Sequence, residues 1–366
     1  MFFFLLPHGE NNPRNSEGAF VELADGSILF AYTQYYGSDW HDECSANIAA
    51  IRSRDGGHTW SEPQVIIRNQ SQNVMSVSLL RLQDGRIAMV VLQKTRIPGH
   101  DGRQPPVCLC GTIPAVDCRP KVYFSADEAL SWSAPVEICD APAVYLVAVN
   151  DCLRQLKSGR LILPVSHHRY GGNARITTPG LGLFYLSDDA GATWRESRVG
   201  CFPPADLSRG LMEPGVAELT DGRILGWYRT RGGCQYKTWS YDHGESWTPP
   251  VPAAEFPSPE ARLAMKRNPK DGCLYAVWND YHPERSVKFA ATGPAVMGRT
   301  PLVIAKSDDD GATWKDHRVI EDAPDHGFAY TAMLFHGDDL LLAYCAGGLP
   351  DCECMLQDIR IRVLPL

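Results

Sequence analysis

Residues 187–194 read Ser-Asp-Asp-Ala-Gly-Ala-Thr-Trp, and this stretch is one of five variants of a single pattern. The pattern is Ser-x-Asp-x-Gly-x-Thr/Ser-Trp, with alanine replacing glycine in one variant, and we call it the tryptophan box. Its copies occupy residues 53–60, 125–132, 187–194, 240–247 and 307–314. The aspartate suits turn amides, the glycine permits positive φ, and the tryptophan offers a large surface for packing between sheets. The boxes therefore predict a structural repeat and not a catalytic site.

A second repeat alternates with the boxes along the chain. It is a short apolar run, a tight turn that usually contains Asp-Gly, and another apolar run, as in residues 20–30. Asp-Gly between apolar runs favours a β-hairpin, because glycine tolerates positive φ. The turn glycines lie 50 to 74 residues apart and are Gly26, Gly85, Gly159, Gly222, Gly272 and Gly337.

Together the two repeats predict the architecture. One hairpin of each kind makes four strands, and 366 residues divided among six units leaves 61 residues per unit. Four-stranded units of this size, repeated radially, are typical of propeller blades. We therefore predict an all-β fold, a six-bladed β-propeller that forms a single domain over residues 1–366. The sixth box is missing, so we expect the N-terminal segment to complete the last blade beside residues 340–344 and 359–363.

Composition excludes several kinds of partner. The chain is 44% hydrophobic and 21% charged, with a net charge of -8. An acidic chain lacks the basic footprint of a nucleic-acid-binding protein, so we expect no nucleic-acid partner. No run of 18 apolar residues occurs, so we expect no membrane-spanning helix. Residues 1–6 are apolar but lack basic residues and end at Pro7, which predicts a terminal strand and a cytoplasmic protein; a trimmed leader of a secreted or periplasmic protein is the alternative.

The twelve cysteines are scattered and form no Cys-x-x-Cys pair. Cys-x-Cys occurs twice, at residues 108–110 and 352–354. We expect reduced structural thiols, no metal site and no cofactor.

The predicted topology gathers polar residues at one mouth of the propeller. All turn glycines and boxes fall on one face, so the other face collects the starts of the innermost strands and the links between blades. Loops at a concave axis are where chemistry is expected. The polar residues at these places are Arg14, Glu17, Asp39, Asp42, Ser76, Arg119, Asn150, Glu213, Arg229, Asn279, Arg299 and Tyr330. Several arginines together predict an anionic ligand, since a guanidinium group pairs with a carboxylate through two hydrogen bonds.

These residues resemble the exo-sialidase (neuraminidase) superfamily, whose members are six-bladed propellers that carry this box as the Asp-box or BNR repeat. Four places carry the resemblance. Arg14 precedes the first strand, Glu213-Pro-Gly is followed by Arg229, Arg299-Thr-Pro leads into the box at 307–314, and Tyr330 opens the last blade. The usual hydrophobic-Pro pair after the first arginine is replaced here by Asn15-Ser16.

The resemblance implies a glycoside hydrolase, a retaining exo-α-sialidase that releases terminal sialic acids or related nonulosonic acids from glycans. It implies that Arg14, Arg229 and Arg299 bind the substrate carboxylate. Tyr330 would be the nucleophile, Glu213 its base, and Asp42 or Asp39 the acid/base; Asp42 is favoured because it lies eleven residues before Ser53. A neutral phenol avoids the repulsion that a carboxylate nucleophile would meet beside an anionic sugar.

Further substrate contacts are expected from Glu17, Arg119, Asn150, Asp151, His167 and Asn279. The expected partner is a sialylated glycan or another acidic sugar, and no metal is implied. Two alternatives stay open: a glycosidase of the same fold for another carboxylated sugar, and a non-catalytic carbohydrate-binding propeller.

Overall fold

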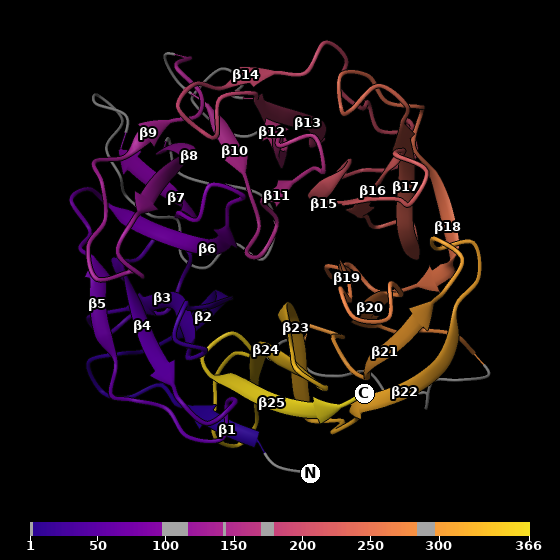
Figure 1. Cartoon of the computed structure of the whole chain (residues 1–366). Helices are drawn as coiled ribbons and strands as arrows, with labels where there is room; N and C mark the ends of the chain where they lie inside the picture. Colours follow the sequence, from indigo (N-terminus) through magenta and orange to yellow (C-terminus); the bar gives the residue numbers. More distant parts are fainter. Residues whose placement is uncertain (1–2, 97–115, 142–143, 170–178, 284–296) are drawn as a thin grey trace.

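The computed structural model describes residues 3–96, 116–141, 144–169, 179–283 and 297–366. Within these residues all regular structure is β, arranged in five sheets around a common centre (Figure 1). The predicted all-β fold is confirmed. Among the described residues no helix is long and apolar enough to cross a membrane.

Four sheets have four strands each. One contains β2 (Asn15–Glu22), β3 (Ile28–Tyr35), β4 (Ala46–Ser53) and β5 (Gln64–Ile67). The next two contain β15 (Met212–Glu218), β16 (Ile224–Arg229), β17 (Cys234–Ser240) and β18 (Val251–Pro257), and β19 (Ala264–Arg267), β20 (Leu274–Asn279), β21 (Leu302–Ser307) and β22 (Lys315–Glu321). The last joins both ends of the chain, with β23 (His326–His336), β24 (Asp339–Gly348), β25 (Ile359–Pro365) and β1 (Phe3–Leu6).

The fifth sheet has nine strands and consists of two groups. The first group is β6 (Asn73–Arg81), β7 (Ile87–Arg96), β8 (Val116–Ser125) and β9 (Val136–Glu137). The second is β10 (Tyr145–Val147), β11 (Arg154–Gln155), β12 (Leu161–His168), β13 (Leu181–Ser187) and β14 (Arg195–Glu196). A single parallel pair, Tyr145 with Cys118, connects the groups.

Every turn glycine connects an innermost strand to its neighbour, and β2, β6, β15, β19 and β23 lie nearest the centre (Figure 1). The predicted hairpins are therefore present. The expected N-terminal strand is present too, since β1 pairs antiparallel with β25 from Phe3 opposite Arg362 to Leu6 opposite Ile359.

Each tryptophan box begins at the last residue of a strand, namely β4, β8, β13, β17 or β21, and closes a tight turn. In residues 187–194, Asp189 accepts the amide of Thr193 at 2.9 Å and its hydroxyl at 2.6 Å, while the Ser187 hydroxyl accepts the amide of Gly191 at 2.9 Å. Trp194 closes the turn by donating its indole N–H to the Gly191 carbonyl at 3.1 Å.

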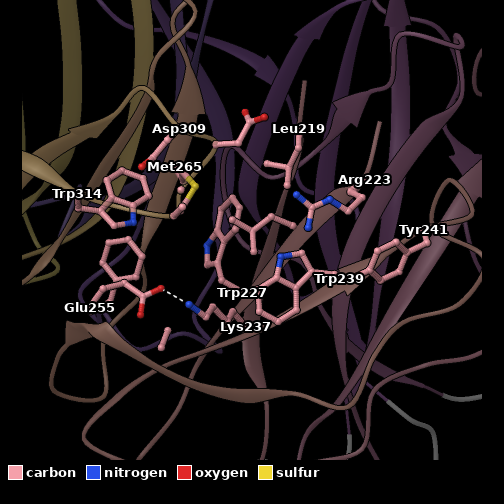
Figure 2. A pocket seen from close by; sticks show the side chains of 16 residues that line it. Leu219, Arg223, Trp227, Lys237, Trp239, Tyr241, Glu255, Met265, Asp309 and Trp314 are labelled. Carbon is pink, nitrogen blue, oxygen red and sulfur yellow. Dashed lines mark hydrogen bonds and ion pairs between the residues drawn. The ribbon is translucent and has the colours of Figure 1, made fainter. Parts of the chain in front are cut away.

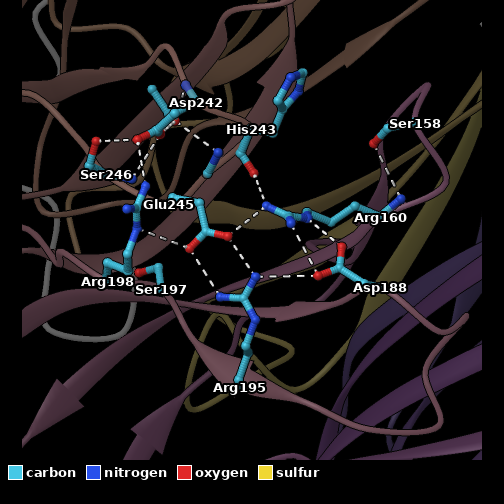
Figure 3. Close-up of polar contacts among 12 residues, drawn as sticks. Ser158, Arg160, Asp188, Arg195, Ser197, Arg198, Asp242, His243, Glu245 and Ser246 are labelled. Atoms are coloured by element: carbon cyan, nitrogen blue, oxygen red, sulfur yellow. Dashed lines mark hydrogen bonds and ion pairs between the residues drawn. The ribbon is translucent and has the colours of Figure 1, made fainter.

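The box tryptophans also pack between neighbouring sheets. Trp247 stacks on Phe184 of β13 with ring centroids 3.8 Å apart, and Trp60 contacts Phe4 of β1 at 6.3 Å. Charged side chains reinforce one such contact (Figure 3): Glu245 pairs with Arg160 at 3.0 Å and with Arg195 at 2.6 Å, and Asp188 pairs with Arg160 at 2.6 Å. Adjacent sheets are thus joined by an apolar contact and an ion network.

The described cysteines are free, in line with the expectation of reduced thiols. Cys108 and Cys110 lie outside the described residues.

The box turns should carry measurable stability, and Asp242 tests this. It accepts hydrogen bonds from the Ser246 amide (2.9 Å), the Ser246 hydroxyl (2.6 Å) and the Ser240 hydroxyl (2.9 Å). Asp242→Ala leaves these donors without their partner, so we expect the free energy of unfolding in urea to fall by about 1–3 kcal/mol. Glu62→Ala, at an exposed position, is the control. Equal stability of the two variants would show that the box is not a stabilising turn.

Candidate active site

The innermost strands of four groups share one irregularity. In β2, β6, β15 and β23 the register shifts by one inserted residue, and within the shift one residue has positive φ. These residues are Glu17 (48°), Ser76 (59°), Glu213 (43°) and Tyr330 (60°). A bulge bends its strand and re-aims a side chain. The left-handed conformation costs a non-glycine residue about 1–3 kcal/mol, so the surrounding packing must impose it.

Packing around Glu213 shows how the conformation is imposed. A Cβ on Gly215 would lie 2.3 Å from the Trp227 ring, so the indole lies directly against the backbone of the bulge. Trp227 is itself fixed, since its Nε1 donates to the Leu263 carbonyl at 2.9 Å. Glycine is required here by this close approach.

Tyr330, Glu213, Arg229 and Arg299 form the first cluster of candidate residues. The Tyr330 hydroxyl donates to Glu213 Oε1 at 3.0 Å. Arg229 Nη1 donates to the same oxygen at 2.6 Å and to the Tyr330 hydroxyl at 3.3 Å. The Arg299 guanidinium lies 5.3 Å from the centre of the Tyr330 ring. A phenol thus faces a carboxylate between two cations.

This environment fixes the protonation states of the pair. Burial acts to raise the pKa of Glu213, but the charges of Arg229 and Arg299 outweigh it and hold the pKa below its usual value. Burial, together with the Glu213 charge, raises the pKa of Tyr330 well above that of a free phenol. At neutral pH the cluster therefore contains a carboxylate and a neutral phenol.

Arg14, Glu17 and Asp42 form the second cluster. Arg14 is 1% exposed and donates through Nη1 to Asp42 Oδ1 at 2.5 Å, and through Nη2 to Glu17 Oε1 at 3.4 Å. Its guanidinium also lies 4.7 Å from the centre of the Tyr35 ring. Glu17 accepts a hydrogen bond from the Ser76 hydroxyl.

Asp42 is the accessible member of this cluster, because 58% of its side chain is exposed. Partial burial acts to raise its pKa, but the charges of Arg14 and Lys94 lower the pKa to about 2. Burial raises the pKa of Glu17 despite the neighbouring Arg14. The two carboxyl groups therefore differ in both exposure and acidity.

The two clusters border the same buried group of apolar side chains. Trp40, from the loop that carries Asp42, and Tyr330 both pack against a buried group that contains Ala329, Cys345 and Met355. Glu17 lies close enough to Tyr330 for its charge to raise the pKa of the phenol. The structure thus brings together the predicted residues Arg14, Glu17, Asp42, Glu213, Arg229, Arg299 and Tyr330.

Asn150 hydrogen-bonds to the backbone beside both clusters. Its amide nitrogen donates to the Gly18 carbonyl at 2.8 Å and to the Tyr330 carbonyl at 2.9 Å. Arg262 binds the Asn150 oxygen at 3.2 Å and the Thr331 carbonyl at 3.0 Å. Asn150 therefore connects the backbone of two bulges that are far apart in the chain.

A family profile described as a BNR repeat-like domain matches residues 112–342, more than half of the chain. The chain belongs to the BNR repeat-like family. Two curated relatives are sialidases. The one from Bacteroides fragilis (strain YCH46) is 21% identical over 346 residues, covering 86% of this chain and 57% of the relative. The one from Micromonospora viridifaciens is 26% identical over 331 residues, covering 85% and 47%.

This BNR-repeat protein thus spans about half the length of the curated relatives it matches. A leech intramolecular trans-sialidase has a similar fold, with a TM-score of 0.72 at 16% identity over 100% of this chain and 70% of that one. The predicted membership of the exo-sialidase superfamily is confirmed.

Other predicted residues of the BNR-repeat protein lie apart from the two clusters or hold backbone. Arg119 pairs with Asp117 and donates to the carbonyls of Cys139 (3.0 Å) and Ala141 (2.9 Å). Asn279 donates to the Phe328 carbonyl at 3.0 Å. His167 is half-buried in β12, and burial lowers its pKa.

Asp151 and Asp39 are also bonded to residues outside the two clusters. Asp151 is buried, pairs with Lys266 at 3.0 Å and accepts the amide of Met333 at 3.0 Å. Asp39 accepts hydrogen bonds from the backbone and ring of His41. Asp42, by contrast, bonds to Arg14.

Two residues that contact the clusters were not predicted from the sequence. Glu260 pairs with Arg229 Nη2 at 3.6 Å, and its carbonyl accepts Arg299 Nη2 at 3.3 Å. Lys94 is buried and donates to the Asp42 carbonyl at 2.9 Å. A signal existed for Lys94, because it lies near the end of the second strand of its group, as Arg229 does.

Two cavities among the described residues lie away from the two clusters. One of about 320 Å³ is lined by residues of β16–β19 and the box at 307–314, including Trp227, Trp239 and Trp314 (Figure 2). Another, of about 830 Å³, lies beside Trp60 and Trp132. Neither cavity is lined by residues of the two clusters. The candidate site is therefore identified by the contacts and charges of its side chains and not by a cavity volume.

The raised pKa of Tyr330 can be measured directly. We expect the phenolate absorbance of wild type minus that of Tyr330→Phe to stay flat up to about pH 10, the value of a free tyrosine. In a Glu213→Gln background the same difference should develop at lower pH, since a neighbouring negative charge is removed. A Tyr330 phenolate below pH 10 in the wild type would contradict the buried pair.

Proposed function

We propose that the protein is a glycosidase of the sialidase type, a retaining exo-α-sialidase acting on terminal sialic acids or related nonulosonic acids of glycans. In this proposal the four four-stranded sheets and the two groups of the nine-stranded sheet are the six blades of one propeller domain spanning residues 1–366. The observation that carries it is the hydrogen bond from Tyr330 to Glu213 at 3.0 Å, beside Arg229 and Arg299.

The first step follows from the pair. Tyr330 Oη attacks the anomeric carbon of the sugar while its proton passes to Glu213, and the bond from that carbon to the leaving oxygen breaks. Glu213 is ionised and able to accept the proton. A neutral phenol approaches a carbon that bears a carboxylate without charge repulsion, and Arg229 stabilises the developing phenolate.

The three arginines have unused hydrogen-bond donors that can bind the sugar carboxylate. The Nε atoms of Arg14, Arg229 and Arg299 are buried and have no hydrogen-bond partner among the described residues. Arg14 and Arg229 hold Asp42 and Glu213 as internal anions, whereas Arg299, among the described residues, hydrogen-bonds to the Glu260 carbonyl. Of these three arginines, Arg299 is therefore the one with no carboxylate in hydrogen-bond contact among the described residues. In this proposal the substrate carboxylate binds it.

Substrate binding also prepares the acid. In the free protein Arg14 keeps Asp42 ionised. A substrate carboxylate that takes Arg14 removes this cation from Asp42 and adds a negative charge nearby, and both changes raise the Asp42 pKa. Asp42 then donates a proton to the leaving oxygen and later removes one from water, which attacks the anomeric carbon. The bond from that carbon to Tyr330 Oη breaks, and Glu213 returns its proton to Tyr330 Oη, which restores the starting state.

Relatives support the substrate class. Both curated relatives are named sialidases, and structures of intramolecular trans-sialidases from leech and Ruminococcus gnavus share the fold. The leech enzyme is described in complex with 2,7-anhydro-Neu5Ac. Analysis of the product by NMR separates hydrolysis, which releases free sialic acid, from such transfer.

Replacement of the nucleophile tests the proposal. We expect Tyr330→Phe to lower kcat/KM on a fluorogenic α-sialoside by about 10³-fold or more, because the attacking oxygen is lost. Tyr36→Phe, at an exposed tyrosine ahead of the acidic loop, should stay at the wild-type value. Full activity of Tyr330→Phe would remove the nucleophile. An inactive wild type would favour another carboxylated sugar or a binding propeller.

Leaving groups distinguish Asp42 from Asp39. Asp42→Ala should lose about 10²–10⁴-fold in kcat/KM on sialyllactose, whose leaving oxygen needs a proton, and far less on an aryl sialoside with an acidic phenol. Asp39→Ala is the matched variant from the same loop and should show no such selectivity. The opposite pattern would assign the acid/base role to Asp39.

A further inference from the structure

Three potential metal ligands meet where the two ends of the chain pair. His8 follows β1, whereas Cys352 and Asp358 lie in the segment between β24 and β25. The ligand atoms of all three lie within 4.8 Å of one another. Cys352 and Asp358 are buried, and the His8 side chain is 29% exposed.

The donor set is one imidazole, one thiol and one carboxylate. Sulfur and nitrogen donors together select zinc over calcium or magnesium, which prefer oxygen. At ordinary zinc bond lengths the ligand atoms of a tetrahedral site lie roughly 3.3–3.6 Å apart. Cys352 Sγ lies 3.4 Å from Asp358 Oδ2, and His8 Nδ1 lies 2.7 Å from Asp358 Oδ1. For a tetrahedral site the second distance has to lengthen by roughly 0.6–0.9 Å, and the two distances involve different oxygens of the Asp358 carboxylate.

We propose that His8, Cys352 and Asp358 bind one zinc ion, with water as the fourth ligand on the exposed side of His8. This revises the sequence prediction of no metal site. The Cys-x-Cys pair contributes Cys352 alone, and the other two ligands come from residues that no short motif connects.

The location gives the ion a structural task. In the other groups a tryptophan box lies between the last two strands, whereas residues 323–366 contain no box. The fourth strand is β1, from the opposite end of the chain (Figure 1). Strand pairing there runs only from Phe3 to Leu6. A zinc ion would link His8, two residues after β1, to Asp358, the residue before β25, and so hold these two strands together.

The same segment borders the candidate active site. Glu353 accepts the indole N–H of Trp40 at 3.0 Å, and the Gln357 carbonyl accepts the Asn15 amide at 2.8 Å. The zinc proposal does not depend on the proposed function, because metal content and stability are measured without substrate.

Metal analysis tests the proposal on the full chain. After purification with zinc and removal of loose metal on a chelating resin, wild type should retain about one zinc per chain. His8→Gln and Cys352→Ser should each retain under about a tenth of this. Cys234→Ser, which changes a half-buried thiol on another sheet, is the control and should retain the wild-type amount. With cobalt(II), wild type should show a near-ultraviolet thiolate-to-cobalt absorption band. Cys352→Ser should not show this band.

Stability provides an independent measurement. A chelator should lower the unfolding temperature of wild type by about 5 °C or more and leave that of His8→Gln unchanged, since this substitution at a partly exposed residue removes a ligand without disturbing the core. Wild type that binds no zinc from excess metal would overturn the proposal. Wild-type zinc content in both ligand variants would overturn it as well.

Discussion

The inner edges of the sheets impose the main constraint on this fold. Innermost strands of neighbouring groups do not pair with each other across the centre, so their backbone groups need other partners, and an unpaired buried carbonyl is costly. Side chains from across the centre supply them. Asn150 binds the carbonyls of Gly18 and Tyr330, Arg262 binds that of Thr331, and Lys266 binds that of Met333 at 2.7 Å. These bonds fix the inner strands relative to one another, and the orientation of the candidate residues follows from them.

Charge balance is the second theme. Buried guanidinium groups are tolerated only when anions accompany them. Arg14 is accompanied by Glu17 and Asp42, and Arg229 by Glu213 and Glu260. The free protein thus contains its own carboxylates where a ligand carboxylate is proposed to bind. Ligand binding then exchanges one anion for another, which changes protonation at the displaced group and avoids creating an uncompensated charge.

The features that could be predicted from the sequence depend on residues close together in the chain. Turn glycines and boxes depend on a few neighbouring residues, so the hairpins were readable, and the constant offset of nine residues before the turn glycine found Glu17 and Glu213. The bulges were not predicted, because they depend on packing such as that of Trp227 on Gly215. The role of Asn150 was not predicted either, since its partners lie 132 and 180 residues away in the chain. Glu260 lies in a link between sheets that has no motif, and only the folded chain brings it to Arg229.

Pairing of β1 with β25 has a consequence for biosynthesis. The last sheet cannot be completed until the C-terminal strand has left the ribosome, although its partner strand was made first. Until then the N-terminal strand has no neighbour and the growing sheets expose apolar edges, a state prone to association with other chains. Contacts between such distant segments also slow the search for the native topology. Nascent chains of this protein therefore depend on the synthesis of β25 to become protected against aggregation.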